Sequence, residues 1–115
     1  MSKIDDITRL KHIRDAAKEA LSFVKGCTKE DLERDRMLSL ALVRLIEIMG
    51  EAANSISEPC QAKYDKIPWR QIVGMRNRLI HAYFEVDLDI VWQVITSDLD
   101  CLLVEVKKAI KDLEV

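Results

Sequence analysis

The sequence predicts an all-α protein, a four-to-five-helix up-and-down bundle that forms one domain over residues 1–115. Apolar residues recur every third or fourth position through most of the chain, which is the period of an amphipathic helix. Aromatic residues make up 5% of a chain that is 49% hydrophobic, so aliphatic side chains are expected to form the core. With 3 Gly and 2 Pro, few residues interrupt the helices. A length of 115 residues is typical of a single domain.

The first half of the chain predicts two long helices. Apolar residues at helical spacing run from Ile4 to Val24, and Gly26 ends this first helix. Thr28 is a suitable N-cap for the second helix, and two acids follow it in the first turn. An apolar stripe continues from there to about Ser57. We therefore expect one uninterrupted second helix.

The second half predicts a short helix and two longer ones. Pro59 is compatible with the first turn of a short helix, and Pro68 with the first turn of the third main helix. This third helix is expected to end near Tyr83. Asp87 or Asp89 then starts the fourth helix, whose apolar positions continue almost to the C-terminus. Short connections between these elements are those of a helical bundle.

The cysteines and apolar runs exclude several classes of protein. The chain has three cysteines, Cys27, Cys60 and Cys101. This odd number and the absence of a Cys-x-x-Cys spacing argue against a disulfide framework or a zinc site. We expect free thiols in a cytoplasmic protein. The apolar runs are too short to span a bilayer, and the N-terminus lacks the apolar stretch of a signal peptide. No membrane association is predicted.

Charge is distributed unevenly along the chain. The net charge is -2, yet the segment 63–78 holds several cations and one acid, whereas 85–100 holds acids and no Lys or Arg. The basic segment favours a phosphate backbone. The acidic segment is either a solvated helix face or a docking surface for a basic partner. The cations of the basic segment are Lys63, Lys66, Arg70, Arg76 and Arg78.

The end of the basic segment contains the groups most suited to chemistry. Arg76, Asn77, His81 and Tyr83 supply a guanidinium, an amide, an imidazole that titrates near neutral pH and a phenol. Such groups bind a phosphate and move protons on a ribose without a metal or a covalent nucleophile. In the alternative interpretation, the Arg and His only stabilise a helix C-terminus, and Tyr83 only closes the core.

The spacing of these residues constrains their geometry. Positions four apart share a helix face, so Asn77 and His81 would align on a regular helix. Positions five apart diverge by about 140°, so Arg76 would not lie beside His81. Either the helix loosens near its end, or Arg76 and His81 meet across a two-fold axis with a second copy.

The octapeptide Arg-Asn-Arg-Leu-Ile-His-Ala-Tyr resembles the Arg-x4-6-His signature of the HEPN superfamily, and most closely its HepT-like branch. In that branch the pattern is Arg, a polar residue, three further positions, His, any residue and Tyr, which Arg76, Asn77, His81 and Tyr83 match. The resemblance implies a homodimer whose motifs face each other. It also implies a metal-independent endoribonuclease toxin, without a cofactor, from a type II/VII-like toxin–antitoxin pair. The antitoxin would be a minimal nucleotidyltransferase (MNT-type) that transfers AMP to Tyr83.

Within this resemblance each residue has an expected role. His81 is the candidate general acid or base, and Arg76 is the electrostatic clamp on the phosphate. Asn77 orients His81 or the phosphate. Further RNA contacts are expected from Lys66, Arg70 and Arg78.

Two carboxylates upstream of the motif admit more than one interpretation. Glu47 and Glu51 lie four apart, but neither His of the chain follows a Glu at the spacing that a di-metal site needs, so we expect no metal. Gly50 between them suggests a close helix crossing. HepT-like proteins often carry a similar Gly-Glu-Ala stretch, which implies that Glu47 or Glu51 orients Arg76. Alternatively, each is a solvated or otherwise paired carboxylate.

Other functions remain open from sequence alone. The domain is alternatively a non-catalytic binding or partner subunit of a minimal nucleotidyltransferase, or a purely structural bundle. Trp69 lies in the basic segment, where it serves either as a core anchor or as a stacking platform for a base.

Overall fold

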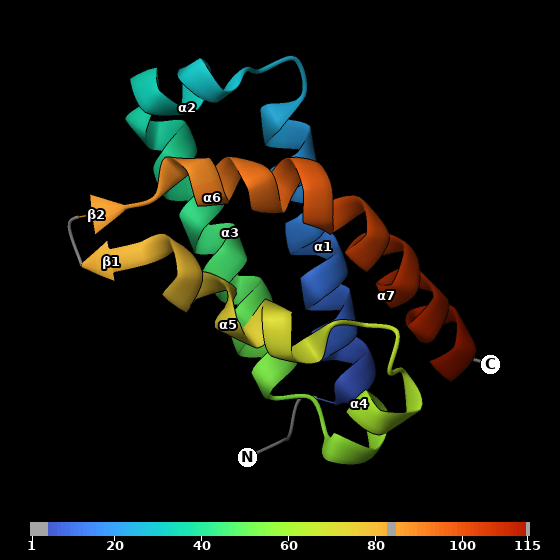
Figure 1. Cartoon of the computed structure of the whole chain (residues 1–115). Helices are drawn as coiled ribbons and strands as arrows, with labels where there is room; N and C mark the ends of the chain where they lie inside the picture. Colours follow the sequence, from blue (N-terminus) through green and yellow to red (C-terminus); the bar gives the residue numbers. More distant parts are fainter. Residues whose placement is uncertain (1–4, 83–84, 115) are drawn as a thin grey trace.

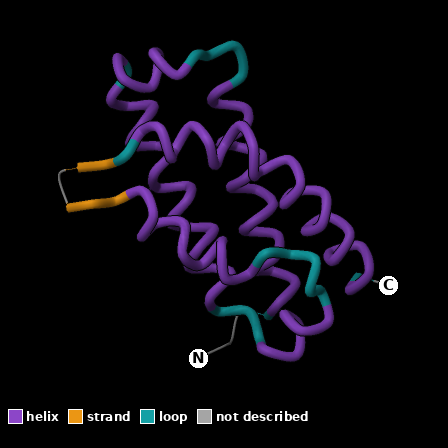
Figure 2. Tube along the Cα trace, viewed as in Figure 1, coloured by secondary structure: helices purple, strands orange, loops and turns teal. Residues whose placement is uncertain are grey.

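A computed structural model of the chain describes residues 5–82 and 85–114, without the side chains of residues 81 and 82. It confirms the predicted all-α fold, to which one short hairpin is added (Figures 1 and 2). In chain order the elements are α1 (Asp6–Val24), α2 (Lys29–Arg34), α3 (Arg36–Asn54), α4 (Glu58–Lys63), α5 (Trp69–Leu79), β1 (Ile80–Ala82), β2 (Glu85–Val86), α6 (Leu88–Gln93), the π-helical segment η1 (Val94–Asp98) and α7 (Leu99–Leu113).

Three long helices, α1, α3 and α7, form the centre of the bundle. α1 packs against α3 on one side and α7 on the other, and α5 crosses α3 (Figure 1). Their apolar faces meet in one core of mainly aliphatic side chains, as the composition predicted. The largest fully buried side chains include Leu10, Ile13, Ile46, Met49 and Ile72. Among the described residues, no helix is long and apolar enough to cross a bilayer.

The predicted second helix is wrong in one respect, because it is two helices. Thr28 caps α2 as expected, in a reciprocal pair of hydrogen bonds with Asp31. The chain then leaves the helical conformation at Asp35, which has φ -107° and ψ 94°. The carboxylate of Asp35 accepts a hydrogen bond from the backbone N–H of Leu38 and so starts α3. A short acidic side chain that bonds the backbone locally favours such a break.

The predicted end of the third main helix is also wrong. Pro68 precedes α5 as expected, but the helix ends at Leu79 and not near Tyr83. The backbone of Ile80 is extended and pairs antiparallel with Val86. The N–H of Asp87 donates to the carbonyl oxygen of Leu79 over 2.7 Å. Pairing with a later segment therefore ends the helix, and the motif continues into the hairpin.

The last helix begins where the sequence indicated and then changes its winding. Asp87 caps α6 by accepting hydrogen bonds from the N–H groups of Asp89 and Ile90. From α6 the helix continues without a gap through η1 into α7. In η1 the hydroxyl of Thr96 donates to the carbonyl oxygen of Trp92 over 2.7 Å. The wider π winding lies where the direction of the helix changes (Figure 1).

Candidate functional site

The site is built on the crossing of α3 and α5. Gly50 brings the two helices together, because a Cβ atom at this position would lie 3.2 Å from the carbonyl oxygen of Ile72 and 3.6 Å from that of Val73. Both neighbours are backbone atoms of α5, which cannot rotate away. The expected close crossing at Gly50 is therefore confirmed. It brings the exposed turns of α3 that flank Gly50 beside the last two turns of α5.

One ion pair joins the motif to this crossing. Nε of Arg76 donates to Oε2 of Glu47 over 3.0 Å. The Glu47 side chain is 24% exposed and the Arg76 side chain 53%, so the carboxylate is sheltered while the guanidinium reaches solvent. A guanidinium has five N–H donors in one plane. A carboxylate on Nε fixes that plane and leaves the two terminal nitrogens to bind a further anion.

A shallow groove surrounds this pair. Glu51 also borders the groove, but its carboxylate pairs with Arg44, with Nη1 to Oε1 at 3.7 Å. Of the two carboxylates that the sequence offered for Arg76, Glu47 makes the contact and Glu51 does not. Asn77 is exposed and borders the same groove. The groove is lined by Glu47, Gly50, Glu51, Asn54, Val73, Arg76 and Asn77.

The motif does not lie on one regular helix. Arg76 and Asn77 are in the last turns of α5, whereas the backbone of His81 is in β1. The divergence of about 140° for a five-residue spacing holds only along a helix, so it does not apply across this break. The side chain of His81 and the whole of Tyr83 lie outside the described residues. The two-fold arrangement stays a prediction.

The other cations of the basic segment do not gather around Arg76. On α5, Arg70 and Arg78 are exposed but lie about 120° and 160° around the helix axis from Arg76. Lys66 borders a different cavity, between the segment after α4 and the end of α7. The Trp69 indole N–H donates to the carbonyl oxygens of Gln61 and Tyr64 at 3.0 Å and 3.1 Å. Trp69 therefore acts as an anchor for α4, as in the first of its two interpretations.

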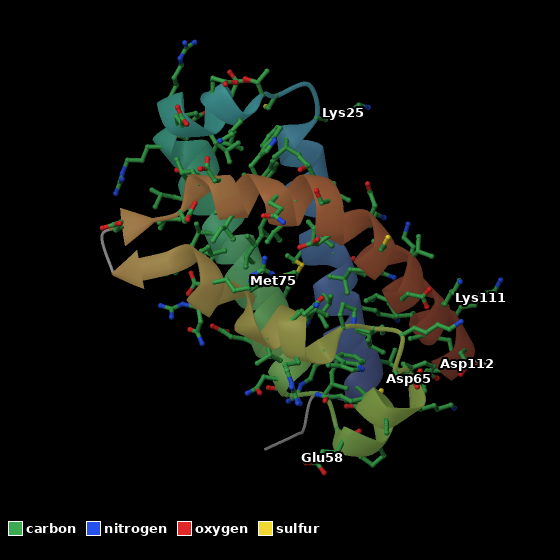
Figure 3. The ribbon with its side chains drawn as sticks, in the orientation of Figure 1. Lys25, Glu58, Asp65, Met75, Lys111 and Asp112 are labelled. Atoms are coloured by element: carbon green, nitrogen blue, oxygen red, sulfur yellow. The ribbon has the colours of Figure 1, made fainter. Side chains whose placement is uncertain are left out.

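The cavity near Lys66 holds a polar cluster that no sequence motif signalled. The Tyr64 hydroxyl donates to the Asp112 carboxylate over 2.5 Å, and Nζ of Lys63 lies 3.6 Å from the same carboxylate. This hydrogen bond raises the pKa of Tyr64 and lowers the pKa of Asp112. Figure 3 shows Asp112 at the end of α7, next to Asp65 in the segment after α4. The cluster fastens α7 to α4 and is separate from the Arg76 groove.

The relationship to known proteins follows from a family comparison. The family described as Ribonuclease HepT-like matches residues 13–109, a range that includes α3, α5 and the hairpin. The chain belongs to the HepT-like ribonuclease family. The resemblance carried by the Arg76 to Tyr83 motif is thus confirmed at the level of the family.

Relatives of this HepT-like chain carry ribonuclease names. "Putative RNase TTE0752" of Caldanaerobacter subterraneus is 37% identical over 90% of this chain and 89% of that protein. "Putative RNase MJ1380" of Methanocaldococcus jannaschii is 33% identical over 93% of this chain and 98% of that protein. "Probable ribonuclease HepT" of Thermococcus cleftensis is 34% identical over 81% and 84%, respectively. No solved structure matches the chain significantly. The family and these names support a ribonuclease function.

Proposed function

We propose that this HepT-like chain is a metal-independent endoribonuclease, with Arg76 and His81 as its catalytic residues. The observation that carries the proposal is the Glu47–Arg76 pair, which holds one motif side chain ready for an anion at the edge of an open groove. Membership of a ribonuclease family makes the phosphate of RNA the appropriate anion.

The reaction needs only proton transfer and charge stabilisation, because RNA carries its own nucleophile. The ribose 2'-oxygen attacks the adjacent phosphorus and loses its proton to a general base, and the bond from phosphorus to the 5'-oxygen breaks. The leaving 5'-oxygen takes up a proton, and a 2',3'-cyclic phosphate remains. His81 is the proposed acid or base, since its imidazole exchanges protons near neutral pH.

Arg76 stabilises the charge that develops on the phosphate. Its terminal nitrogens are donors in a fixed plane, and Glu47 holds that plane through Nε. Asn77, which borders the same groove, orients the phosphate or His81. Glu51 supports the groove from α3, and Lys66, Arg70 and Arg78 guide the flanking RNA by long-range attraction.

Expression in cells tests this function. We expect that the wild-type chain, induced alone, arrests growth and degrades RNA, whereas His81→Ala and Arg76→Ala do neither. His12→Ala is the matched control, because His12 is the other histidine of the chain and lies exposed on α1. Intact RNA and normal growth with the wild type would contradict the nuclease. If the chain then still bound a nucleotidyltransferase, the non-catalytic partner subunit would be the better function.

We further propose that the chain is the toxin of a type II/VII-like pair in the cytoplasm, neutralised by AMP transfer to Tyr83. An added phosphate can occupy Arg76 in place of RNA, and the adenosine can block the groove. Incubation with a neighbouring minimal nucleotidyltransferase, Mg²⁺ and ATP should add about 329 Da per AMP and suppress cleavage. Tyr83→Phe should remain active and escape this suppression. Modification of a different residue would refute the assignment.

We also propose that the active form is a homodimer whose two motifs face a common cleft. A symmetric interface offers the same surface twice, so each groove would lie beside that of the partner. Light scattering at micromolar concentration should give twice 13.2 kDa.

A further inference from the structure

The exposed face of α3 carries a regular stripe that crosses the candidate site. Four residues of this face recur at intervals of four, three and four positions, so they share one side of the helix: Leu40, Arg44, Glu47 and Glu51. Leu40 is one of the large hydrophobic residues exposed to solvent, and Val73 of α5, beside Glu51 in the groove, is another. This surface, here called the α3 stripe, thus combines apolar contacts with charges of both signs.

The charges of the α3 stripe are arranged symmetrically. Arg44 and Glu51 lie one turn to either side of Glu47, and their side chains are 61% and 71% exposed. In the isolated chain they approach each other to only 3.7 Å across the Glu47 turn. The charge of Glu47 between them is already matched by Arg76. The stripe therefore presents a cation and an anion about one turn to either side of Glu47. Their mutual contact of 3.7 Å is long and both side chains are largely exposed, so each can exchange it for an opposite charge on a partner.

This pattern distinguishes between two ways of pairing identical stripes. If two copies of α3 met in parallel, Arg44 would face Arg44 and Glu51 would face Glu51, and both contacts would be repulsive. If they meet antiparallel about a two-fold axis near Glu47, Arg44 of each copy faces Glu51 of the other. Both contacts are then attractive, and opposite charges that match across an interface fix its register.

The apolar residues fit the same register. Leu40 lies one turn beyond Arg44, so it would reach one turn beyond Glu51 of the second copy. Val73, which is also exposed, borders the groove on the side of Gly50. A second copy on the stripe would therefore cover exposed apolar surface at Leu40 and beside the groove, and the two-fold axis repeats this burial.

We infer that a second copy of this chain docks on the α3 stripe, antiparallel about an axis near Glu47, with Arg44 of each copy paired to Glu51 of the other. The inference rests on the proposed homodimer and specifies its surface and register. In this arrangement Arg44 of the second copy comes to the rim of the groove that contains Arg76. Each site then gains a second guanidinium from its partner, and α3 of the partner covers one side of the groove.

Charge reversal tests the register. Arg44→Glu and Glu51→Arg each turn two attractive contacts into two repulsive ones, so each should raise the Kd of the dimer about tenfold or more. The double variant Arg44→Glu/Glu51→Arg restores both contacts with the charges exchanged and should dimerise like the wild type. Lys108→Glu is the matched control, since it reverses an equally exposed charge that pairs with Glu105 at 3.5 Å on α7. Sedimentation or light scattering over a concentration series gives the Kd, and circular dichroism verifies folding.

Each outcome has a definite meaning. Loss of dimer in both single variants with recovery in the double variant supports the register. A double variant as weak as the singles, or single variants that dimerise like the wild type, overturns it, and a monomeric wild type overturns it as well. RNA cleavage by the wild type, measured on the same samples, decides the proposed nuclease separately.

Discussion

Gly50→Ala is the sharpest test of the helix crossing on which the site is built. The added Cβ would lie 3.2 Å from the carbonyl oxygen of Ile72, closer than an ordinary van der Waals contact. Relief requires α3 and α5 to separate by a few tenths of an ångström, because the neighbour is backbone within a helix. Gly74 provides the matched control. It also lies inside a helix, α5, but a Cβ there would meet nothing within 4 Å among the described atoms.

The two substitutions share one contribution and differ in another. Each replaces a helical Gly by Ala, which favours the helix by about 1 kcal/mol. Only Gly50→Ala adds overpacking, which typically costs about 1–3 kcal/mol. We therefore expect Gly74→Ala to stabilise the protein by up to about 1 kcal/mol. Gly50→Ala should be about 1–3 kcal/mol less stable than Gly74→Ala, a difference in which the shared helix propensity cancels.

Urea unfolding followed by circular dichroism gives this difference directly, with all chains at the same concentration so that dimerisation does not distort it. Cleavage by Gly50→Ala should fall as well, since the separation of α3 from α5 displaces Glu47 from Arg76. If Gly50→Ala proves as stable as Gly74→Ala, the close crossing does not hold the helices as described.

Three further results are expected. Glu47→Gln removes an ion pair whose guanidinium is about half exposed, so the free energy of unfolding in urea should change by less than about 1 kcal/mol while the cleavage rate falls about tenfold. Glu105→Gln is the control, because this carboxylate of similar exposure pairs with Lys108 on α7 and should leave the cleavage rate unchanged; equal rates in the two variants would contradict the positioning of Arg76. Because burial raises the pKa of Cys60, iodoacetamide at pH 8 should label exposed Cys101 first by peptide mass mapping, and faster labelling of Cys60 would be inconsistent with its burial. Tyr64→Phe removes the hydrogen bond that lowers the pKa of Asp112. The wild type should therefore be more stable than Tyr64→Phe above the ordinary carboxyl pKa of 3.8, and this difference in stability should disappear as the pH falls below it. A difference in stability that does not depend on pH would exclude this linkage.

The starts of α2, α5 and α6 could be predicted from the sequence because capping is local. Thr28 and Asp87 accept hydrogen bonds from backbone N–H groups two or three residues further along, and Pro68 fixes the backbone before α5. Apolar spacing likewise identified the buried faces, since burial of one face is what gives an amphipathic helix its period.

The helix break at Asp35 and the early end of α5 could not be predicted in the same way. The end of α5 depends on a distant partner strand, and at Asp35 a helical backbone and a capped break are both compatible with the local sequence. The end of α5 at Leu79 is set by pairing of Ile80 with Val86, beyond the reach of helical periodicity. At Asp35 the helical backbone is interrupted, although the spacing of apolar residues continues across this position.

The candidate site shows the same division. Resemblance to the HepT-like motif singled out Arg76, Asn77, His81 and Tyr83, and implied that Glu47 or Glu51 orients Arg76. Glu47 and Glu51 share a helix face, and only the register of α5 against Gly50 decides that Glu47 meets Arg76. That register is a property of packing, which the spacing of charged residues along α3 does not encode.

Cleavage of a defined RNA by the purified chain in excess EDTA tests the central claim most directly. Wild type and His12→Ala should cleave the RNA, leave 2',3'-cyclic phosphate or 3'-phosphate ends, and spare the all-deoxy strand. His81→Ala and Arg76→Ala should each be slower by about 10²-fold or more. Cleavage of the deoxy strand, activity that EDTA abolishes and a divalent metal restores, or an undiminished rate in His81→Ala would contradict this account.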